Sequence, residues 1–189
     1  MRFSVYLILH GFYFCCFSAV IASANTLVEF QTNAPTPNNR FIVELYDGNR
    51  SLEFRNTPIT VANFLNYVNS GAYDNTIIHR SVSNFVIQGG GFIRPQVPAD
   101  QPNSNPVSVT TNGTIINEPG NANIRGTIAM AKLGGQPDSA TSQWFFNLSD
   151  NAFLDTDNGG YTVFGRILDN GMTVIDQLAS ALTYDATTY

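Results

Sequence analysis

Alternating apolar and polar residues along several short stretches of the chain predict β-strands. In the clearest stretch, Phe41, Val43 and Leu45 share one face, and the turn residues Asp47-Gly48 follow. Other strands are expected at residues 27–30, 76–88, 127–131, 143–148 and 161–167. One more short strand is expected within the Pro-, Asn- and Thr-rich connection over residues 93–125.

Two further stretches carry apolar residues at helical spacing. The first begins at Thr57-Pro58, where threonine is a typical N-cap and proline suits the first helical position, and Gly71 ends it. The second covers residues 172–179. Many short strands with only two helices favour a mainly β fold, an antiparallel sheet or barrel with helical covers.

The first residues are expected to lie outside this fold. A basic start at Met1-Arg2 precedes an apolar run over residues 5–22 and the small-residue site Ala22-Ser23-Ala24. This order is typical of a secretory signal peptide, so we expect a signal peptide at 1–24 and one domain at 25–189. An uncleaved anchor helix is the alternative. After cleavage no stable membrane insertion is expected, and the location is the periplasm or the medium.

Composition narrows the possible functions. The chain has 189 residues, 43% of them hydrophobic and only 12% charged, and its net charge is −5. A net-acidic chain without a basic run argues against nucleic-acid binding, which needs Lys and Arg to displace counterions. Both cysteines, Cys15 and Cys16, lie in the predicted signal peptide, so residues 25–189 contain no thiol and no disulfide.

The same inventory excludes several kinds of active site. His79 is the only histidine after residue 24, so a Cys-His pair and a site of several His or Cys metal ligands are impossible there. No Gly-x-Ser-x-Gly motif is present. Residues 155–160 begin like a calcium loop, but Gly159 occupies a ligand position, and a tight polar turn is the better interpretation. Glycines 89–91 favour close backbone packing or a bulge over phosphate binding. An enzyme without nucleophile, metal or cofactor remains possible, as does a binding module.

Two dense stretches of sequence carry a strong resemblance. They contain the strings His79-Arg80-x7-Gln88-Gly89-Gly90 and Thr141-Ser142-Gln143-x-Phe145-Phe146. In order and spacing the chain resembles the cyclophilins, the peptidyl-prolyl cis-trans isomerases, from about residue 28 to residue 179, and most closely their exported bacterial branch. The resemblance implies an eight-stranded antiparallel β-barrel capped by two helices, with a substrate groove on its outer face. In that family a final strand after the second helix pairs with the first, and here residues 182–189 offer little to pair.

The resemblance also assigns roles to residues. It implies a catalytic group in which Arg80 is the catalytic arginine, Phe85 belongs to the proline-pocket wall and Gln88 helps to position Arg80. It implies substrate contacts for eight more residues: Val86, Ala131, Lys132, Gln143, Phe145, Phe153, Leu154 and Tyr161. Phe153 stands where many members have tryptophan, which predicts weak cyclosporin binding because the indole N–H donor is absent.

The sequence therefore predicts a prolyl isomerase that assists protein folding, needs no cofactor or metal, acts on proline-containing unfolded or flexible polypeptides and is a monomer. Two alternatives stay open. A proline-peptide-binding module or holdase chaperone would keep the groove with little catalysis, and a structural barrel would have no peptide role.

Overall fold

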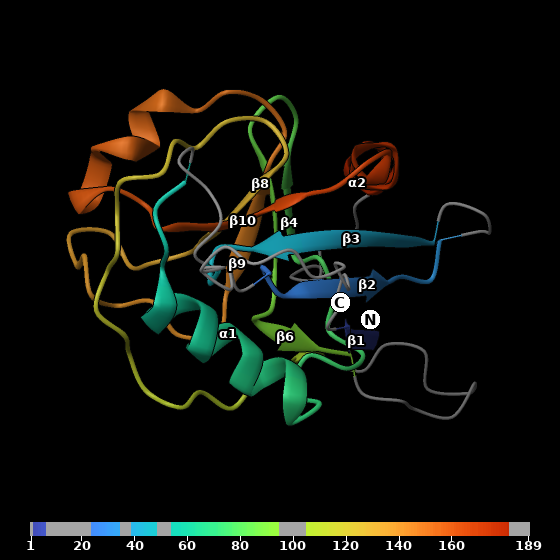
Figure 1. The fold of residues 1–189 in the computed structure, drawn as a ribbon. Helices are drawn as coiled ribbons and strands as arrows, with labels where there is room; N and C mark the ends of the chain where they lie inside the picture. The colour runs from blue at the N-terminus through green and yellow to red at the C-terminus, as the bar shows by residue number, and fades with distance from the viewer. Residues whose placement is uncertain (1, 7–23, 35–38, 49–53, 95–104, 182–189) are drawn as a thin grey trace, which may run out of the picture.

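The structure is a computed structural model that describes residues 2–6, 24–34, 39–48, 54–94 and 105–181 (Figure 1). Its helices are α1 (Pro58–Asn69) and α2 (Gly171–Ala179), with two 3₁₀ turns, η1 (Ala152–Asp155) and η2 (Asp157–Gly159). The strands are β1 (Arg2–Tyr6), β2 (Leu27–Gln31), β3 (Arg40–Leu45), β4 (Arg80–Val82), β5 (Val86–Gly89), β6 (Phe92–Ile93), β7 (Val107–Ser108), β8 (Thr127–Met130), β9 (Trp144–Asn147) and β10 (Val163–Ile167).

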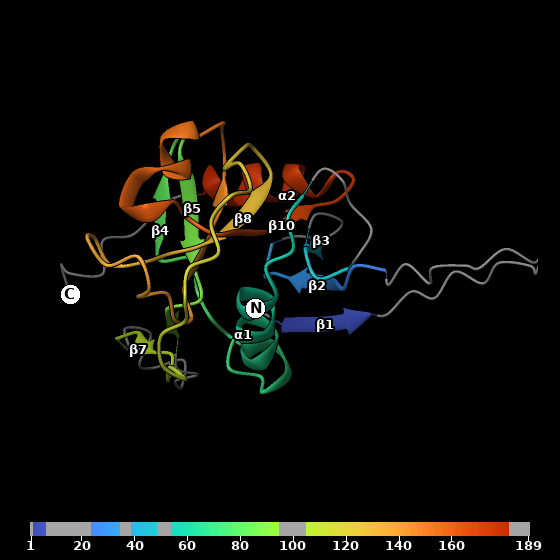
Figure 2. The same ribbon diagram turned by 60° about the vertical axis from the view of Figure 1, so that its left-hand side comes forward.

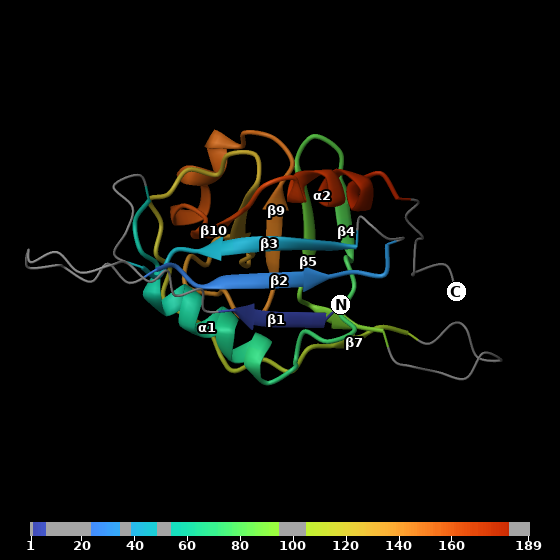
Figure 3. The same ribbon diagram turned by 45° about the vertical axis from the view of Figure 1, so that its right-hand side comes forward.

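Eight of these strands form one antiparallel sheet in the order β1-β2-β3-β10-β8-β9-β5-β4, and β6 pairs with β7 separately. The sheet is strongly curled, so that β2 and β3 cross the direction of β8 and β9 (Figure 1). Helices α1 and α2 lie at opposite ends of it (Figure 3). The mainly β, antiparallel architecture with two helical covers is confirmed. Among the described residues the sheet forms a half-barrel, since β1 and β4 end the strand order.

The two faces of the sheet bury different clusters. The inner face carries the large aromatic core, in which Phe30 packs edge-on against Trp144 and Phe146 at ring-centroid distances of 5.5 Å. Helix α1 adds Phe64, which is fully buried against the same core. The outer face carries a smaller cluster that includes Val86, Phe145 and Leu154. Alternation along each strand separates the two, because neighbouring side chains in a strand point to opposite faces.

The predicted strand over residues 76–88 is wrong in one respect. The segment turns between Val82 and Phe85, where the Phe85 N–H donates to the Val82 carbonyl at 3.1 Å and Asn84 takes a left-handed φ of 56°. Asparagine tolerates this conformation better than most residues. Strands β4 and β5 are therefore neighbours in a hairpin (Figure 2), and Arg80 becomes the register partner of Gln88.

Helix α1 begins where the sequence predicts, but its cap is different. The Thr57 side chain makes no capping bond, and its buried hydroxyl has no hydrogen-bond partner. The carboxylate of Glu118, from the long connection, instead accepts from the N–H groups of Ile59 (3.3 Å) and Thr60 (2.8 Å) and from the Thr60 hydroxyl. A negative group at a helix N-terminus accepts hydrogen bonds from the free N–H donors and interacts favourably with the positive end of the helix dipole.

The edge of β2 is covered by β1. Residues 2–6 pair with β2 over five register positions, from Arg2 opposite Gln31 to Tyr6 opposite Leu27. This is the edge on which the family resemblance implies a final strand, and residues 182–189 lie outside the described residues. Strand β1 belongs to the stretch predicted to be a signal peptide, whose other residues up to 23 also lie outside the described part. No helix in the described ranges is both long enough and apolar enough to span a bilayer.

Candidate active site

The strand register brings two of the three predicted catalytic residues, Arg80 and Gln88, into one row on the outer face. Arg80 on β4 lies opposite Gln88 on β5, Gln88 opposite Phe145 on β9, and Phe145 opposite Ala129 on β8. Neighbouring strands lie about 4.8 Å apart, so the row spans four strands within a short distance. Its members face outward because Ile87 and Phe146, the next residues in sequence, are fully buried in the inner core.

Arg80 lies over an aromatic ring. Its guanidinium carbon is 5.5 Å from the centroid of the Phe85 ring, and Phe85 in turn stacks on Phe153 at 5.6 Å with an interplanar angle of 23°. A cation over an aromatic face is stabilised by about 0.5–2 kcal/mol. Within the described ranges no carboxylate pairs with Arg80. The rings therefore orient the guanidinium without neutralising its charge.

An apolar cluster adjoins this arginine; it contains the residues that the resemblance assigns to the proline pocket and is called the outer-face pocket here. Val86, Phe145 and Leu154 are buried in the outer-face cluster, and Phe85, Ala131 and Tyr161 pack against it while remaining partly exposed. The Tyr161 ring meets Phe145 edge-on at 5.8 Å. Phe153, with 57% of its surface exposed, stands at the rim. A partly open hydrophobic surface beside one unpaired cation can bind a small apolar ring and present a donor to it.

Two glutamines connect this row to the glycine run. The Gln88 side-chain amide donates to the Gln143 side-chain oxygen at 2.7 Å. The Gln143 side chain packs on the backbone of Gly91, where an added Cβ would lie 2.8 Å from the Gln143 amide carbon. Close packing is therefore the reason for glycine at this position, as the sequence predicts. The structure shows no direct hydrogen bond from Gln88 to Arg80 and links them through strand pairing.

Lys132 lies at the far end of the pocket. Its ammonium nitrogen donates to the backbone carbonyls of Asn158 (2.9 Å) and Gly160 (2.7 Å) and lies 4.7 Å from the centroid of the Tyr161 ring. Burial lowers the pKa of Lys132, against the attraction of the Asp138 and Asp157 carboxylates. The Lys132 ammonium, which the resemblance implies contacts substrate, thus forms its hydrogen bonds within the protein.

His79 precedes the predicted catalytic residue Arg80, and its side chain interacts with Gln143 and Phe92. Its ring packs edge-on against Phe92 at 4.9 Å, and its Nδ1 is buried without a hydrogen-bond partner. Burial, with a smaller contribution from the neighbouring Arg80 charge, lowers the pKa of His79. These contacts agree with a structural role for this histidine.

Three buried asparagines under the pocket are not among the residues that the sequence predicts for the site. The Asn151 amide donates to the Phe85 carbonyl (3.1 Å) and the Asn147 side chain (2.8 Å), and Asn147 donates to Asn123 (3.3 Å). Asn123 continues the chain of amides to the Tyr161 carbonyl at 3.3 Å. These bonds tie opposite walls of the pocket together. Nothing in the local sequence distinguishes buried asparagines from the many exposed ones.

All eleven predicted site residues lie on or beside the outer-face pocket. The β4-β5 hairpin and β9 with its preceding residue contribute Arg80, Phe85, Val86, Gln88, Gln143 and Phe145. The 3₁₀ turn η1 contributes Phe153 and Leu154, and loops contribute Ala131, Lys132 and Tyr161. The described residues contain no group of three or more His, Cys, Asp or Glu side chains that could hold a metal ion.

Comparison with known proteins identifies the family. The family model for cyclophilin type peptidyl-prolyl cis-trans isomerase/CLD matches residues 27–188. The chain belongs to the cyclophilin-type peptidyl-prolyl cis-trans isomerases. Cyclophilins isomerise the peptide bond before proline, and this is the activity of the chain.

Individual cyclophilins support the same assignment. The chain is 41% identical over 166 residues to a peptidyl-prolyl cis-trans isomerase of Acinetobacter baylyi, covering 86% of this chain and 76% of that protein. It is 43% identical over 163 residues to an isomerase of Streptomyces antibioticus, covering 82% and 84%. Among solved structures, a Cryptosporidium parvum cyclophilin crystallised in the presence of the dipeptide Ala-Pro is 25% identical, with a TM-score of 0.58 over 79% of this chain and 85% of that one.

Proposed function

We propose that the outer-face pocket is the isomerase active site and that Arg80 is its catalytic residue, acting on proline-containing segments of unfolded or flexible polypeptides. The observation that carries this proposal is the row from Arg80 through Gln88 to Phe145, which sets an unpaired guanidinium beside an apolar pocket. The Ala-Pro dipeptide in the related Cryptosporidium structure supports a proline-containing ligand.

Rotation about the prolyl bond needs no covalent chemistry. The barrier is about 18–20 kcal/mol because twisting breaks amide resonance. In the twisted state the prolyl nitrogen regains its lone pair and becomes a hydrogen-bond acceptor. The Arg80 guanidinium can donate a hydrogen bond to that nitrogen. In the planar ground state the lone pair is delocalised and cannot accept, so this hydrogen bond stabilises the transition state selectively.

The required stabilisation is modest. Uncatalysed isomerisation takes tens to hundreds of seconds. A turnover of about 10 per second, typical of enzymes, needs roughly a 10³-fold gain, or about 4 kcal/mol. One oriented donor aimed at developing charge contributes about 3–4 kcal/mol in enzymes where it has been removed by mutation. The pocket formed by Phe85, Phe145 and Leu154 would hold the proline ring while the rest of the chain turns.

The decisive test is the rate of X-Pro isomerisation with Arg80→Ala. We expect kcat/KM to fall about 10²–10³-fold while the fold is retained, because Arg80 is exposed and makes no ion pair in the described ranges. Arg40→Ala, which removes an exposed cation paired with Glu29, is the matched control and should keep full activity. Equal rates for Arg80→Ala and the wild type would refute the mechanism. Peptide binding by a wild type that lacks turnover would favour the holdase alternative.

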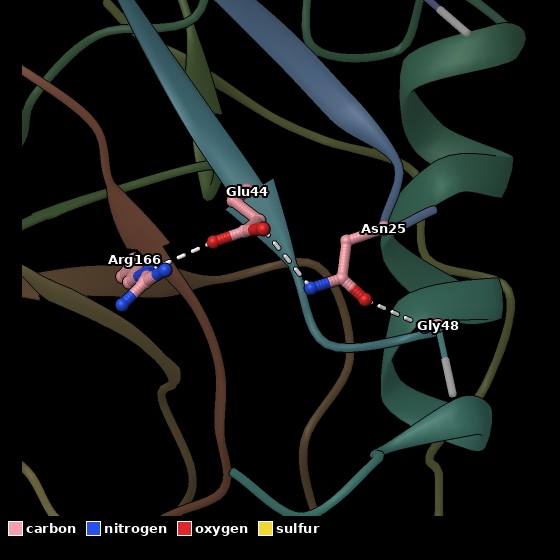
Figure 4. Close-up of polar contacts among 4 residues, drawn as sticks. All are labelled: Asn25, Glu44, Gly48 and Arg166. Carbon is pink, nitrogen blue, oxygen red and sulfur yellow. Dashed lines mark hydrogen bonds and ion pairs between the residues drawn. The ribbon is translucent and has the colours of Figure 1, made fainter. Parts of the chain in front are cut away.

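We further propose that residues 1–24 are an export signal, whose cleavage removes β1 from the edge of β2, and that the mature enzyme acts as a monomer in the periplasm or outside the cell. The polar contacts at Asn25 support a boundary here (Figure 4). The Asn25 side chain donates to Glu44 at 3.1 Å and accepts from the Gly48 N–H at 2.8 Å, so the residue after the small-residue site is bound to the domain. Glu44 also pairs with Arg166 at 2.8 Å. N-terminal sequencing of the protein from cell fractions should give Asn25 first; a start at Met1 would contradict cleavage.

Weak cyclosporin binding follows from the rim of the pocket. Phe153 is exposed and has no N–H donor, so its ring can contact an apolar ligand but cannot donate a hydrogen bond. Phe153→Trp should therefore tighten cyclosporin inhibition by about 10-fold, the effect of one hydrogen bond. Unchanged inhibition would show that this position does not limit binding.

A further inference from the structure

Lys132 is the only lysine of the chain, and its contacts define an internal clamp. Its ammonium donates to two backbone carbonyls of one loop, those of Asn158 and Gly160. The bond pattern is reciprocal, since the Asn158 side-chain amide donates to the carbonyl of Leu133 at 2.9 Å. Two consecutive residues after β8 thus hold residues 158–160 from both directions.

The clamped loop has an unusual backbone. Asn158, Gly159 and Gly160 all have positive φ angles, of 51°, 76° and 78°. Asparagine pays a conformational cost in this region, and such a run persists only when surrounding contacts determine it. Asn117 adds further contacts by donating to the carbonyls of Gly159 (3.0 Å) and Gly160 (2.7 Å). The loop conformation therefore depends on side chains from other parts of the chain.

The loop joins two walls of the pocket. Leu154, buried in the pocket, precedes it, and Tyr161 follows it; the Tyr161 N–H donates to the Leu154 carbonyl at 2.8 Å. On the other side of the clamp, Ala131 packs against the same apolar cluster. A shift of residues 158–160 would move the Tyr161 ring relative to Phe145, on which it packs.

We propose that Lys132 is a positioning residue of this isomerase: it fastens the 158–160 loop and the Tyr161 ring to the end of β8 and thereby sets the width of the proline pocket. Its charge acts within the protein and makes no contact with substrate. The inference rests on the proposed active site, because it assigns a function to the wall of that pocket.

The electrostatic surroundings agree with a positioning role. The groups facing the ammonium are the Tyr161 ring and the carboxylates of Asp138 and Asp157. Burial nevertheless lowers the pKa of Lys132, so the folded chain holds this proton less tightly than the unfolded chain does. The charge by itself does not stabilise the fold globally, and a neutral side chain of similar length should still allow folding.

The kinetic experiment compares Lys132→Met and Lys132→Arg on one X-Pro peptide. We expect Lys132→Met to raise KM about 10-fold with kcat within about 2-fold of the wild type, because a displaced pocket wall weakens binding of ground state and transition state equally. Lys132→Arg keeps a cation with several donors and should recover most of the affinity. Arg40→Met, which removes an exposed cation from β3, should change neither constant. An unchanged KM in Lys132→Met would overturn the proposal, and so would a loss confined to kcat.

A spectroscopic experiment tests the clamp without using activity. Protein labelled only with ¹³C-lysine gives a single set of lysine side-chain signals, since the chain has one lysine. Its Hε protons should be shifted by the Tyr161 ring current, and Tyr161→Leu should return them to the value of free lysine. A wild-type signal already at the free value would overturn the proposal whatever the kinetics show. If Arg80 proves not to be catalytic, the shifted lysine signals should still be observed. The experiment therefore distinguishes failure of the clamp from failure of the proposed active site.

Discussion

The two faces of the sheet are built from adjacent residues of the same strands, yet they serve different purposes. On β9, Trp144 and Phe146 point into the inner core, whereas Phe145 and Asn147 point to the outer face. The inner face is a closed stack of aromatic rings, and the outer face is a partly open pocket with one unpaired guanidinium at its edge. We therefore expect stability to depend mainly on the inner face and catalysis on the proposed site of the outer face, although a single alternation pattern generates both.

The largest expected effect separates the two faces at neighbouring positions. Phe146→Ala should cost about 3–5 kcal/mol in the free energy of unfolding, the usual value for an aromatic ring lost from a core. Phe145→Ala should cost less, about 1–3 kcal/mol, and should lower kcat/KM of the folded protein at least about 10-fold because a pocket wall is lost. Urea unfolding and isomerase assays on both variants measure the contrast. Similar stability losses together with similar activities would show that the faces are not functionally distinct.

The glycine run tests how tightly the two faces are coupled at the end of β5. An added Cβ at Gly90 would lie 2.6 Å from the Trp144 indole nitrogen and 2.7 Å from the Ser142 carbonyl oxygen, and φ is +75°. Gly90→Ala should cost about 2–5 kcal/mol from conformation and overpacking together. Gly135→Ala is the matched control, since φ is +73° and nothing lies within 4 Å. Its cost should be about 1–2 kcal/mol, and equal losses at both sites would exclude a packing contribution.

The N-terminal cap of α1, the helix that packs on the inner core, can be tested by mutating its two candidate capping residues. Glu118→Ala should destabilise the protein by about 0.5–2 kcal/mol, because two N–H groups and the Thr60 hydroxyl lose their acceptor. Thr57→Val, at the position where the sequence predicts the cap, should be nearly neutral, because the Thr57 hydroxyl is buried without a partner. Thermal unfolding of the two variants checks this order. A larger loss of stability for Thr57→Val than for Glu118→Ala would show that Thr57, and not Glu118, is the effective cap of α1.

The smallest expected effect is the contribution of His79 to the pH dependence of stability. Its pKa is lowered by burial, so the unfolded chain takes up a proton at a higher pH than the folded chain. The contribution of His79 to stability is therefore complete above the ordinary histidine value near 6.5 and declines as pH falls below it. His79→Gln should flatten the decline in stability between about pH 6.5 and 5 without altering activity strongly at neutral pH. An identical pH profile for wild type and His79→Gln would contradict this.

The sequence could predict most of the elements, since periodicity alone places β2, β3, α1, β8, β9 and α2 to within about one or two residues. It could not predict the hairpin between β4 and β5. An apolar-rich run interrupted by Ser83-Asn84 is compatible with one long strand, and the decision depends on β9, which pairs with β5 and leaves β4 at the edge. In one continuous strand, Arg80 and Gln88 would lie about 26 Å apart at roughly 3.3 Å per residue.

The sequence predicted some features of the candidate site and not others. Arg80, Phe85, Gln88 and Phe145 were identified through their motifs, and the structure brings them together. The hydrogen bonds of Lys132 could not be predicted, because their acceptors are carbonyls 26 and 28 residues away in the chain. Every amide and lysine in the sequence has the same local chemistry, and only the fold determines which of them meet a buried acceptor.

By itself, the sequence determined the residue types of this isomerase: which side chains alternate between faces, the absence of thiols and of a second histidine after residue 24, and the family motifs. Local spacing is enough for these properties, because they depend on neighbours within one element. The tertiary structure alone decided which residues act together. The strand register sets Arg80 beside Gln88 and Phe145, and long-range hydrogen bonds fasten Lys132 to the loop before Tyr161. Both depend on contacts between segments whose separation in the sequence carries no local signal.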